Sequence, residues 1–237
     1  MKISIDIKHL FFLTLAFILF TVIGTVTHEL GHIIVAKSYG YETTLHYRSM
    51  NYKNSDLIER LTEIYNENKT LIENETDFDQ KAEYEKGIKK YQSSSLYITI
   101  GGPLQTILTG IVGLLIISYR RDQISKGKLR LIDWLAVFLA LFWLREVFNV
   151  AMSIGREVIS PNGSYFTGDE KKISYGLNLW EGTIPLVLGI LGLLISIFVI
   201  FRIIPHRLRL TFITGGFLGG ILGFLLWMDV LGPELLP

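Results

Sequence analysis

The sequence predicts an all-α polytopic membrane protein with about five transmembrane helices, and two observations support this fold class. Of its 237 residues, 49% are hydrophobic and only 19% are charged, and the mean hydropathy is +0.38. The apolar residues also gather in runs that each reach the roughly 20 residues a helix needs to cross about 30 Å of hydrocarbon. These runs cover residues 9–36, 96–119, 131–153, 183–204 and 210–231. Because lipid offers no partner for backbone N–H and C=O groups, such runs are expected to be helices.

The first run follows Lys2 and Lys8 and so resembles a secretory signal, but no small-x-small cleavage site comes after it. We therefore expect 1–237 to form a single membrane domain in the lipid bilayer. Lys and Arg in the short connections favour the side that carries the N-terminus. This bias predicts a multi-pass protein with a cytoplasmic N-terminus, in the plasma membrane.

Between the first two spans lies a long polar insertion, residues 41–95. Apolar residues recur at helical spacing across 55–72, which predicts an amphipathic helix. Thr76 followed by Asp79 resembles a capping box that opens a second helix. The insertion is expected to be a helical hairpin, either resting on the membrane surface or acting as a lid or substrate clamp.

The chain contains no cysteine, which excludes disulfides, thiolate metal ligands and cysteine nucleophiles. Any metal must therefore bind through His, Asp or Glu. The formal net charge is only +1, so there is no basic surplus for nucleic acid and we expect no such partner.

The strongest chemical motif is His28-Glu29-Leu30-Gly31-His32, at the end of the first span. On a helix, His28 and His32 lie one turn apart on the same face and can bind one Zn²⁺. Zinc with three protein ligands keeps a fourth position for water, for which Glu29 is the expected general base. The pattern thus predicts amide hydrolysis. The alternative is an interfacial helix end whose histidines meet lipid headgroups.

A second segment, Gly101-Gly102-Pro103-Leu104-Gln105, opens the next apolar run. Together with the histidine motif, it resembles the site-2 protease family of zinc intramembrane proteases, in order and spacing over 1–40 and 96–175. The resemblance implies cleavage of a transmembrane or membrane-adjacent peptide, a glycine-proline helix start beside the zinc, and an aspartate ligand after a third span. The family's aspartate segment is not present as such; Phe148-Asn149 and Gly168-Asp169-Glu170 take its place.

Topology narrows the third metal ligand, since only residues on the same side of the membrane as His28 can contact the ion. This condition is met by the end of the first span, the segment 41–95, the start of the second span, the end of the third span and the connection 154–182. Asp169 is the first choice there, followed by three other acidic residues, Glu170, Glu157 and Glu146. The alternative for Asp169 is a loop position at the start of a short helix, capped by Thr167 with Glu170.

Five further residues are candidates for contact with substrate or with the metal ligands. Glu146 and Asn149 share one face of the third span and could orient a ligand or the substrate carbonyl, although charge pairing at an interface explains them too. Gly102 and Pro103 allow close backbone approach at a helix start, beside which a substrate strand could pair. Gln105 stands where the resembled family more often has Asn.

The function predicted from the sequence is that of a zinc-dependent intramembrane endopeptidase. Its substrate would be a membrane protein, cut in or next to a transmembrane segment. The alternative is a non-catalytic membrane protein of the same fold, either a metal transporter or a scaffold, because intramembrane His and acidic residues also mark ion pathways.

Overall fold

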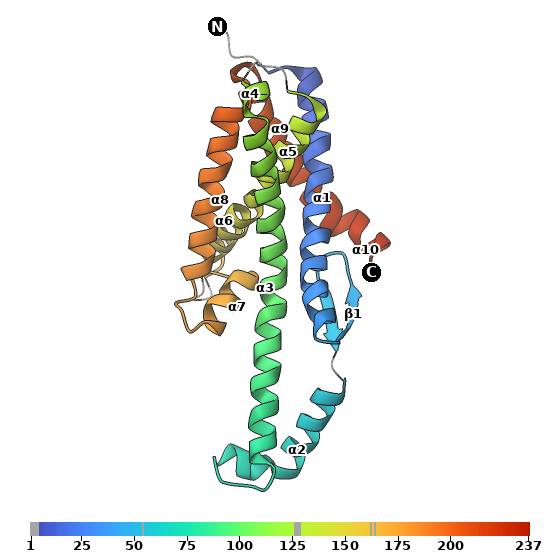
Figure 1. Cartoon of the computed structure of the whole chain (residues 1–237), viewed down its shortest axis with the longest axis vertical. Helices are drawn as coiled ribbons and strands as arrows, with labels where there is room; N and C mark the ends of the chain where they lie inside the picture. The colour runs from blue at the N-terminus through green and yellow to red at the C-terminus, as the bar shows by residue number, and fades with distance from the viewer. Residues whose placement is uncertain (1–4, 54, 126–128, 162, 164) are drawn as a thin grey trace.

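The computed structural model describes residues 5–53, 55–125, 129–161, 163 and 165–237, and helices make up most of it (Figure 1). Within these residues, five helical segments are long and apolar enough to cross a membrane. They are Ile7–Ser38, Lys81–Tyr119, Leu131–Ile159, Thr183–Ile203 and His206–Leu235. The five predicted spans are therefore found, with altered bounds. Many of their large apolar side chains are exposed, as expected of surfaces that face lipid.

The first span is helix α1 (Ile7–Ser38), which contacts α3 and α9. Asp6 caps its start, where its carboxylate accepts a hydrogen bond from the His9 N–H at 3.1 Å. The helix ends before Gly40, whose φ of +79° turns the chain into the insertion.

Helix α3 (Lys81–Tyr119) corrects the predicted start of the second span. The polar segment before residue 96 joins the span in one continuous helix, because no proline interrupts it and its residues are mostly good helix formers. At about 1.5 Å per residue, the helix exceeds the roughly 30 Å of hydrocarbon. Its N-terminal part, together with α2, extends past the other helices (Figure 1). Gly101, Gly102 and Pro103 consequently lie inside α3, so the predicted glycine-proline helix start is wrong.

The insertion also differs from the predicted pair of helices. It opens with an antiparallel hairpin, β1 (Glu42–Leu45) and β2 (Met50–Lys53). Helix α2 (Ser55–Glu73) then confirms the amphipathic helix expected over 55–72. The predicted capping box is wrong, because the Thr76 hydroxyl donates to the Leu71 carbonyl at 3.1 Å.

Hydrogen bonds hold α2 and the β1–β2 hairpin against two of the long helical segments. Arg60 of α2 donates to both carboxylate oxygens of Glu83 in α3, at 2.8 and 3.1 Å. The Trp227 indole N–H donates to the Tyr47 carbonyl in the hairpin turn at 2.7 Å. Helix α2 is thus tied to the N-terminal part of α3, and the hairpin is tied to the last span.

The third span is interrupted. Helices α5 (Leu131–Ala140) and α6 (Leu144–Ile159) flank a short 3-10 turn, η1 (Leu141–Trp143). The short helix α4 (Arg121–Ile124) precedes it, after α3. Asp133 in the first turn of α5 is buried and accepts from Arg120 at the end of α3, at 2.5 and 3.3 Å. This ion pair joins the two spans at the end of the molecule far from α2.

The remaining elements follow the third span. Helix α7 (Gly168–Gly176) lies beside α3, and α8 (Thr183–Phe198) continues into a π-helical turn, η2 (Val199–Ile203). After η3 (His206–Leu208) come α9 (Arg209–Leu225), η4 (Leu226–Leu231) and α10 (Gly232–Leu235). Phe17, Phe138 and Phe212 meet edge to face in the main apolar core, where α1, α5 and α9 join.

Candidate metal centre

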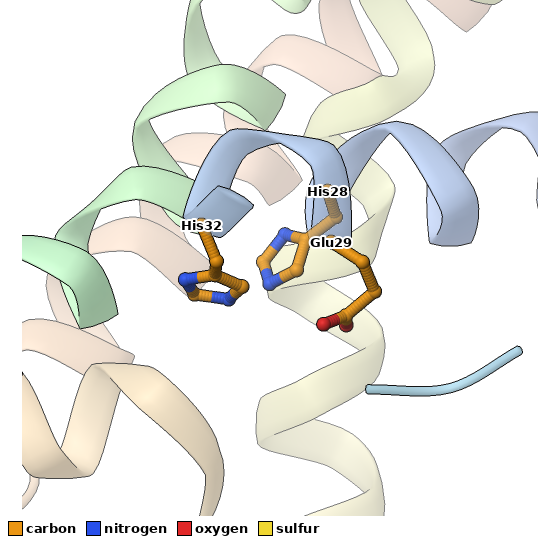
Figure 2. Close-up of side chains that lie close together, drawn as sticks. All are labelled: His28, Glu29 and His32. Carbon is orange, nitrogen blue, oxygen red and sulfur yellow. The ribbon is translucent and has the colours of Figure 1, made fainter. Parts of the chain in front are cut away.

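Helix α1 brings His28, Glu29 and His32 to one side of its last third. Each is at least nine-tenths buried, and one potential ligand atom of each lies within 4.8 Å of the others. The two imidazole centroids are 4.9 Å apart. Figure 2 shows the His28 ring between the His32 ring and the Glu29 carboxylate. The four-residue spacing therefore places both imidazoles as the sequence predicts.

The Nδ1 atoms of both histidines face acceptors on α3. His32 Nδ1 lies 2.7 Å from the carbonyl oxygen of Ile98 and 3.2 Å from the backbone nitrogen of Gly102, and the shorter contact, to an oxygen that only accepts, favours the tautomer with the proton on Nδ1. His28 Nδ1 lies 3.0 Å from the hydroxyl of Thr106, which itself donates to the Gly102 carbonyl and is free to accept from the ring. Both rings thus leave Nε2 with an open lone pair, the arrangement found in zinc-binding histidines.

Asp169, in the first turn of α7, completes the cluster. Its Oδ2 lies 3.3 Å from His28 Nε2 and 3.1 Å from His32 Nε2, while its Oδ1 lies 3.5 Å from Lys172 Nζ. The Asp169 carboxylate thus contacts both imidazoles and the ammonium group of Lys172.

These three atoms fit zinc. A tetrahedral ion with bonds of about 2.0–2.2 Å places its ligand atoms roughly 3.3 Å apart, close to the 3.1 and 3.3 Å found between Asp169 and the histidines. With both ring protons on Nδ1, three acceptor atoms converge, and a shared cation would satisfy them.

Glycines in α1 and α3 make this approach possible. A Cβ on Gly101 would lie 2.6 Å from the Gly31 carbonyl oxygen, so the two helix backbones touch at this crossing. A Cβ on Gly102 would overlap the Nε2 atoms of both His28 and His32. Gly102 therefore leaves the space that the imidazoles and an ion need, a role different from the predicted helix start. Pro103, next to it, is buried inside α3.

The other acidic candidates make no contact with the two imidazoles in the described part of the chain. Glu170 is buried and accepts from the Asn149 amide at 3.1 Å. Glu146 is also buried, and neither of its carboxylate oxygens has a hydrogen-bond partner within the described residues. Glu157 accepts from the Gly163 N–H at 2.8 Å. Among the four acidic candidates, all of them in the described part of the chain, only Asp169 contacts both histidines, and Asn149 contacts its neighbour Glu170.

Asp169 does lie at the start of a short helix, as the alternative reading expects, but the capping box of that alternative is not formed. Thr167 makes no capping hydrogen bond, and its hydroxyl lies 2.9 Å from that of Ser153 in α6. The φ of +83° at Gly168 turns the chain into α7. As a result, Asp169 faces α1 while Glu170 faces α6.

Gln105 lies one turn beyond Gly101 on α3, and its Cβ is against Gly31. Its amide donates to the Thr109 hydroxyl at 2.9 Å, and its buried Oε1 has no partner within the described residues. The side chain is thus beside the helix crossing, and no contact with the histidine rings is found for it.

A cleft of about 500 Å³ opens beside Asp169, between α6 and the start of α7. It is lined by polar, charged and apolar side chains, among them Arg145, Asn149, Met152, Ser153, Arg156, Ile159, Thr167, Asp169 and Glu170. The side chain of Asp169 is 24% exposed, whereas that of His28 is 1% exposed. The cleft is therefore the open side of the cluster.

Two functional partners were not predicted from the sequence, Thr106 and the Ile98 carbonyl. Both lie four residues from Gly102, so the three positions share one face of α3. That spacing was visible in the sequence. What the sequence did not show was which face of α3 packs against α1.

Comparison with known proteins adds no relative, since no family model matches the chain and the searches of curated proteins and of solved structures return no match.

Proposed function

We propose that this chain is a zinc-dependent endopeptidase that hydrolyses a peptide bond in or next to a transmembrane segment of a membrane protein. The observation that carries the proposal is the convergence of His28 Nε2, His32 Nε2 and Asp169 Oδ2 at 3.1–3.3 Å, with both Nδ1 atoms engaged elsewhere. The resemblance of the histidine motif and the Gly-Gly-Pro segment to the site-2 protease family is consistent with it.

In this proposal His28, His32 and Asp169 are the metal ligands. Bound there, zinc supplies a Lewis acid that polarises a peptide carbonyl and acidifies a water molecule. Glu29 lies next to His28, with a carboxylate oxygen within 4.8 Å of a ring nitrogen of each histidine, and its carboxylate would take a proton from that water and deliver it to the leaving amine. Thr106 and the Ile98 carbonyl orient the two rings.

The substrate would approach along the cleft at Asp169. An intact helix keeps its peptide bonds in internal hydrogen bonds, so the segment must unwind before a carbonyl can meet the ion. A cleft of about 500 Å³ accommodates a few residues of extended chain. We further propose, from the Lys and Arg of the connections, that the N-terminus is cytoplasmic and that the protein resides in the plasma membrane.

The test compares wild type with Glu29→Gln, which is nearly isosteric but cannot accept a proton. Both purified proteins are analysed for zinc and incubated with a membrane-helix reporter. We expect stoichiometric zinc in both and cleavage by wild type alone. If wild type did not cleave the reporter, and if both proteins carried zinc across vesicle membranes equally well, the chain would instead be a transporter. If neither protein contained zinc, the metal site would be refuted.

A further inference from the structure

Arg145 places a positive charge in the lining of the cleft, beside the candidate metal cluster. It is half-buried near the start of α6, in the third span, and it lines the cleft together with Asp169. Its Nε is buried without a hydrogen-bond partner, and no salt bridge to it is found among the described residues. Because a charge in a membrane span is expensive, a guanidinium there is expected to have a partner.

The carboxylates nearby have other positions or partners. Asp169 contacts the two imidazoles, and Glu170 accepts from Asn149. Glu146, adjacent to Arg145 in the chain, and Glu29 both lie within range of its charge, but no ion pair joins either of them to Arg145 among the described residues. The partner of Arg145 is therefore to be sought in the cleft.

One face of α6 lines the cleft along much of the length of the helix. Arg145, Asn149, Met152, Arg156 and Ile159 recur at helical spacing and line it together. Arg156, in the last turn of α6, is exposed. Arg145 lies near the N-terminal end of α6 and lines the cleft together with Asp169, the residue that contacts both histidines. A ligand at Arg145 would thus lie beside the reacting bond.

We infer that Arg145 is a specificity-determining residue that binds a carboxylate of the peptide substrate, close to the bond that is cut. The inference rests on the proposed function. A guanidinium matches a carboxylate with two parallel hydrogen bonds, and such charge-assisted bonds are strong where water is excluded. The carboxylate is either an Asp or Glu side chain or a free C-terminus, and both offer the same two oxygens.

The experiment uses the full chain loaded with zinc and two sets of reporter peptides. In the first set, a neutral membrane-segment peptide with an amidated C-terminus receives one Asp at successive positions around the cleaved bond, each paired with an Asn control. In the second set, the neutral peptide ends at successive positions with a free or an amidated C-terminus. We expect one position in either set at which the carboxylate raises kcat/KM by about tenfold or more.

Three variants test whether Arg145 is the cause of that carboxylate preference. Arg145→Gln should reduce the carboxylate-to-neutral ratio to about one while it still cleaves the neutral peptide and retains zinc. Arg145→Lys, which keeps the charge without the planar fork, should keep part of the preference. Arg207→Gln, a matched change at an exposed arginine between α8 and α9, should keep all of it. The inference would be overturned if Arg145→Gln left the carboxylate-to-neutral ratio of kcat/KM unchanged, or if it lowered kcat/KM equally for both peptides. It would also be overturned if the substitution changed only how cleavage depends on anionic lipid in the vesicles.

A binding measurement separates this inference from the proposed function. Labelled peptides are titrated into Glu29→Gln with and without Arg145→Gln. Tighter binding of the carboxylate peptide that requires Arg145, without cleavage by wild type, would refute proteolysis but support the carboxylate site. Cleavage by wild type without any carboxylate preference would support proteolysis but refute the carboxylate site.

Discussion

The Nδ1 atom of His32 lies 2.7 Å from the carbonyl oxygen of Ile98, one helical turn before Gly102 on the neighbouring helix. The contact joins α1 to α3 and directs the opposite ring nitrogen toward Asp169. It depends on the touching backbones of Gly31 and Gly101, so the helix crossing and the geometry of the metal cluster are one structural feature.

Replacing Asp169 by Ala should sharply reduce zinc content, since the change removes the anionic atom that is nearest to both imidazoles. Thermal unfolding in detergent provides a readout independent of cleavage. Zinc added at about 100 times its Kd should stabilise metal-free wild type and Glu29→Gln by roughly 2.7 kcal/mol, and should leave Asp169→Ala nearly unchanged. Full zinc content in Asp169→Ala would remove this residue from the ligand set.

Gly102→Ala should abolish zinc binding, because the added methyl would overlap the Nε2 atoms of His28 and His32. Gly24→Ala, one turn before His28 on α1, is a matched control whose Cβ would make only an ordinary contact with Phe142, at 3.9 Å. Metal analysis of the two purified variants checks this. Equal zinc in both would mean that the space in front of Gly102 is not where the ion binds.

Thr106→Val keeps the shape of the side chain but removes the acceptor for His28 Nδ1. Loss of such a partner commonly costs about 10–100-fold in metal affinity, and we expect a decrease of this size in competition with a zinc chelator. Thr62→Val on the exposed side of α2 removes a hydroxyl that bonds only its own helix, at the Ile58 carbonyl, and should not change the affinity. The prediction fails if the two variants bind zinc equally.

Gly113→Ala should destabilise the protein by about 1–3 kcal/mol, the usual cost of overpacking. A Cβ there would lie 2.7 Å from the Ala136 carbonyl oxygen and would overlap the Ala140 nitrogen, both backbone atoms of α5. Gly220→Ala in α9, where a Cβ would have nothing within 4 Å, serves as the control. Thermal unfolding of both in detergent is the measurement, and equal stability would indicate that α3 and α5 are not packed this closely.

Much of the fold was predictable because membrane spans are specified locally. Run length and hydropathy were enough to find the five helical spans and the amphipathic helix α2. The start of α3 and the β1–β2 hairpin were not found. A polar helix that continues a span gives no break in hydropathy, and a hairpin of four-residue strands has too few residues for a periodic signal.

The sequence alone determined that His28, Glu29 and His32 share one side of a membrane helix, because helical periodicity fixes the relative directions of residues four apart. Only the tertiary structure decided which acidic residue meets them and which atoms orient the rings. Asp169 is 137 residues from His32 in the chain, and its position depends on how α7 packs beside α3. Such long-range contacts follow from packing, which no local pattern in the sequence encodes.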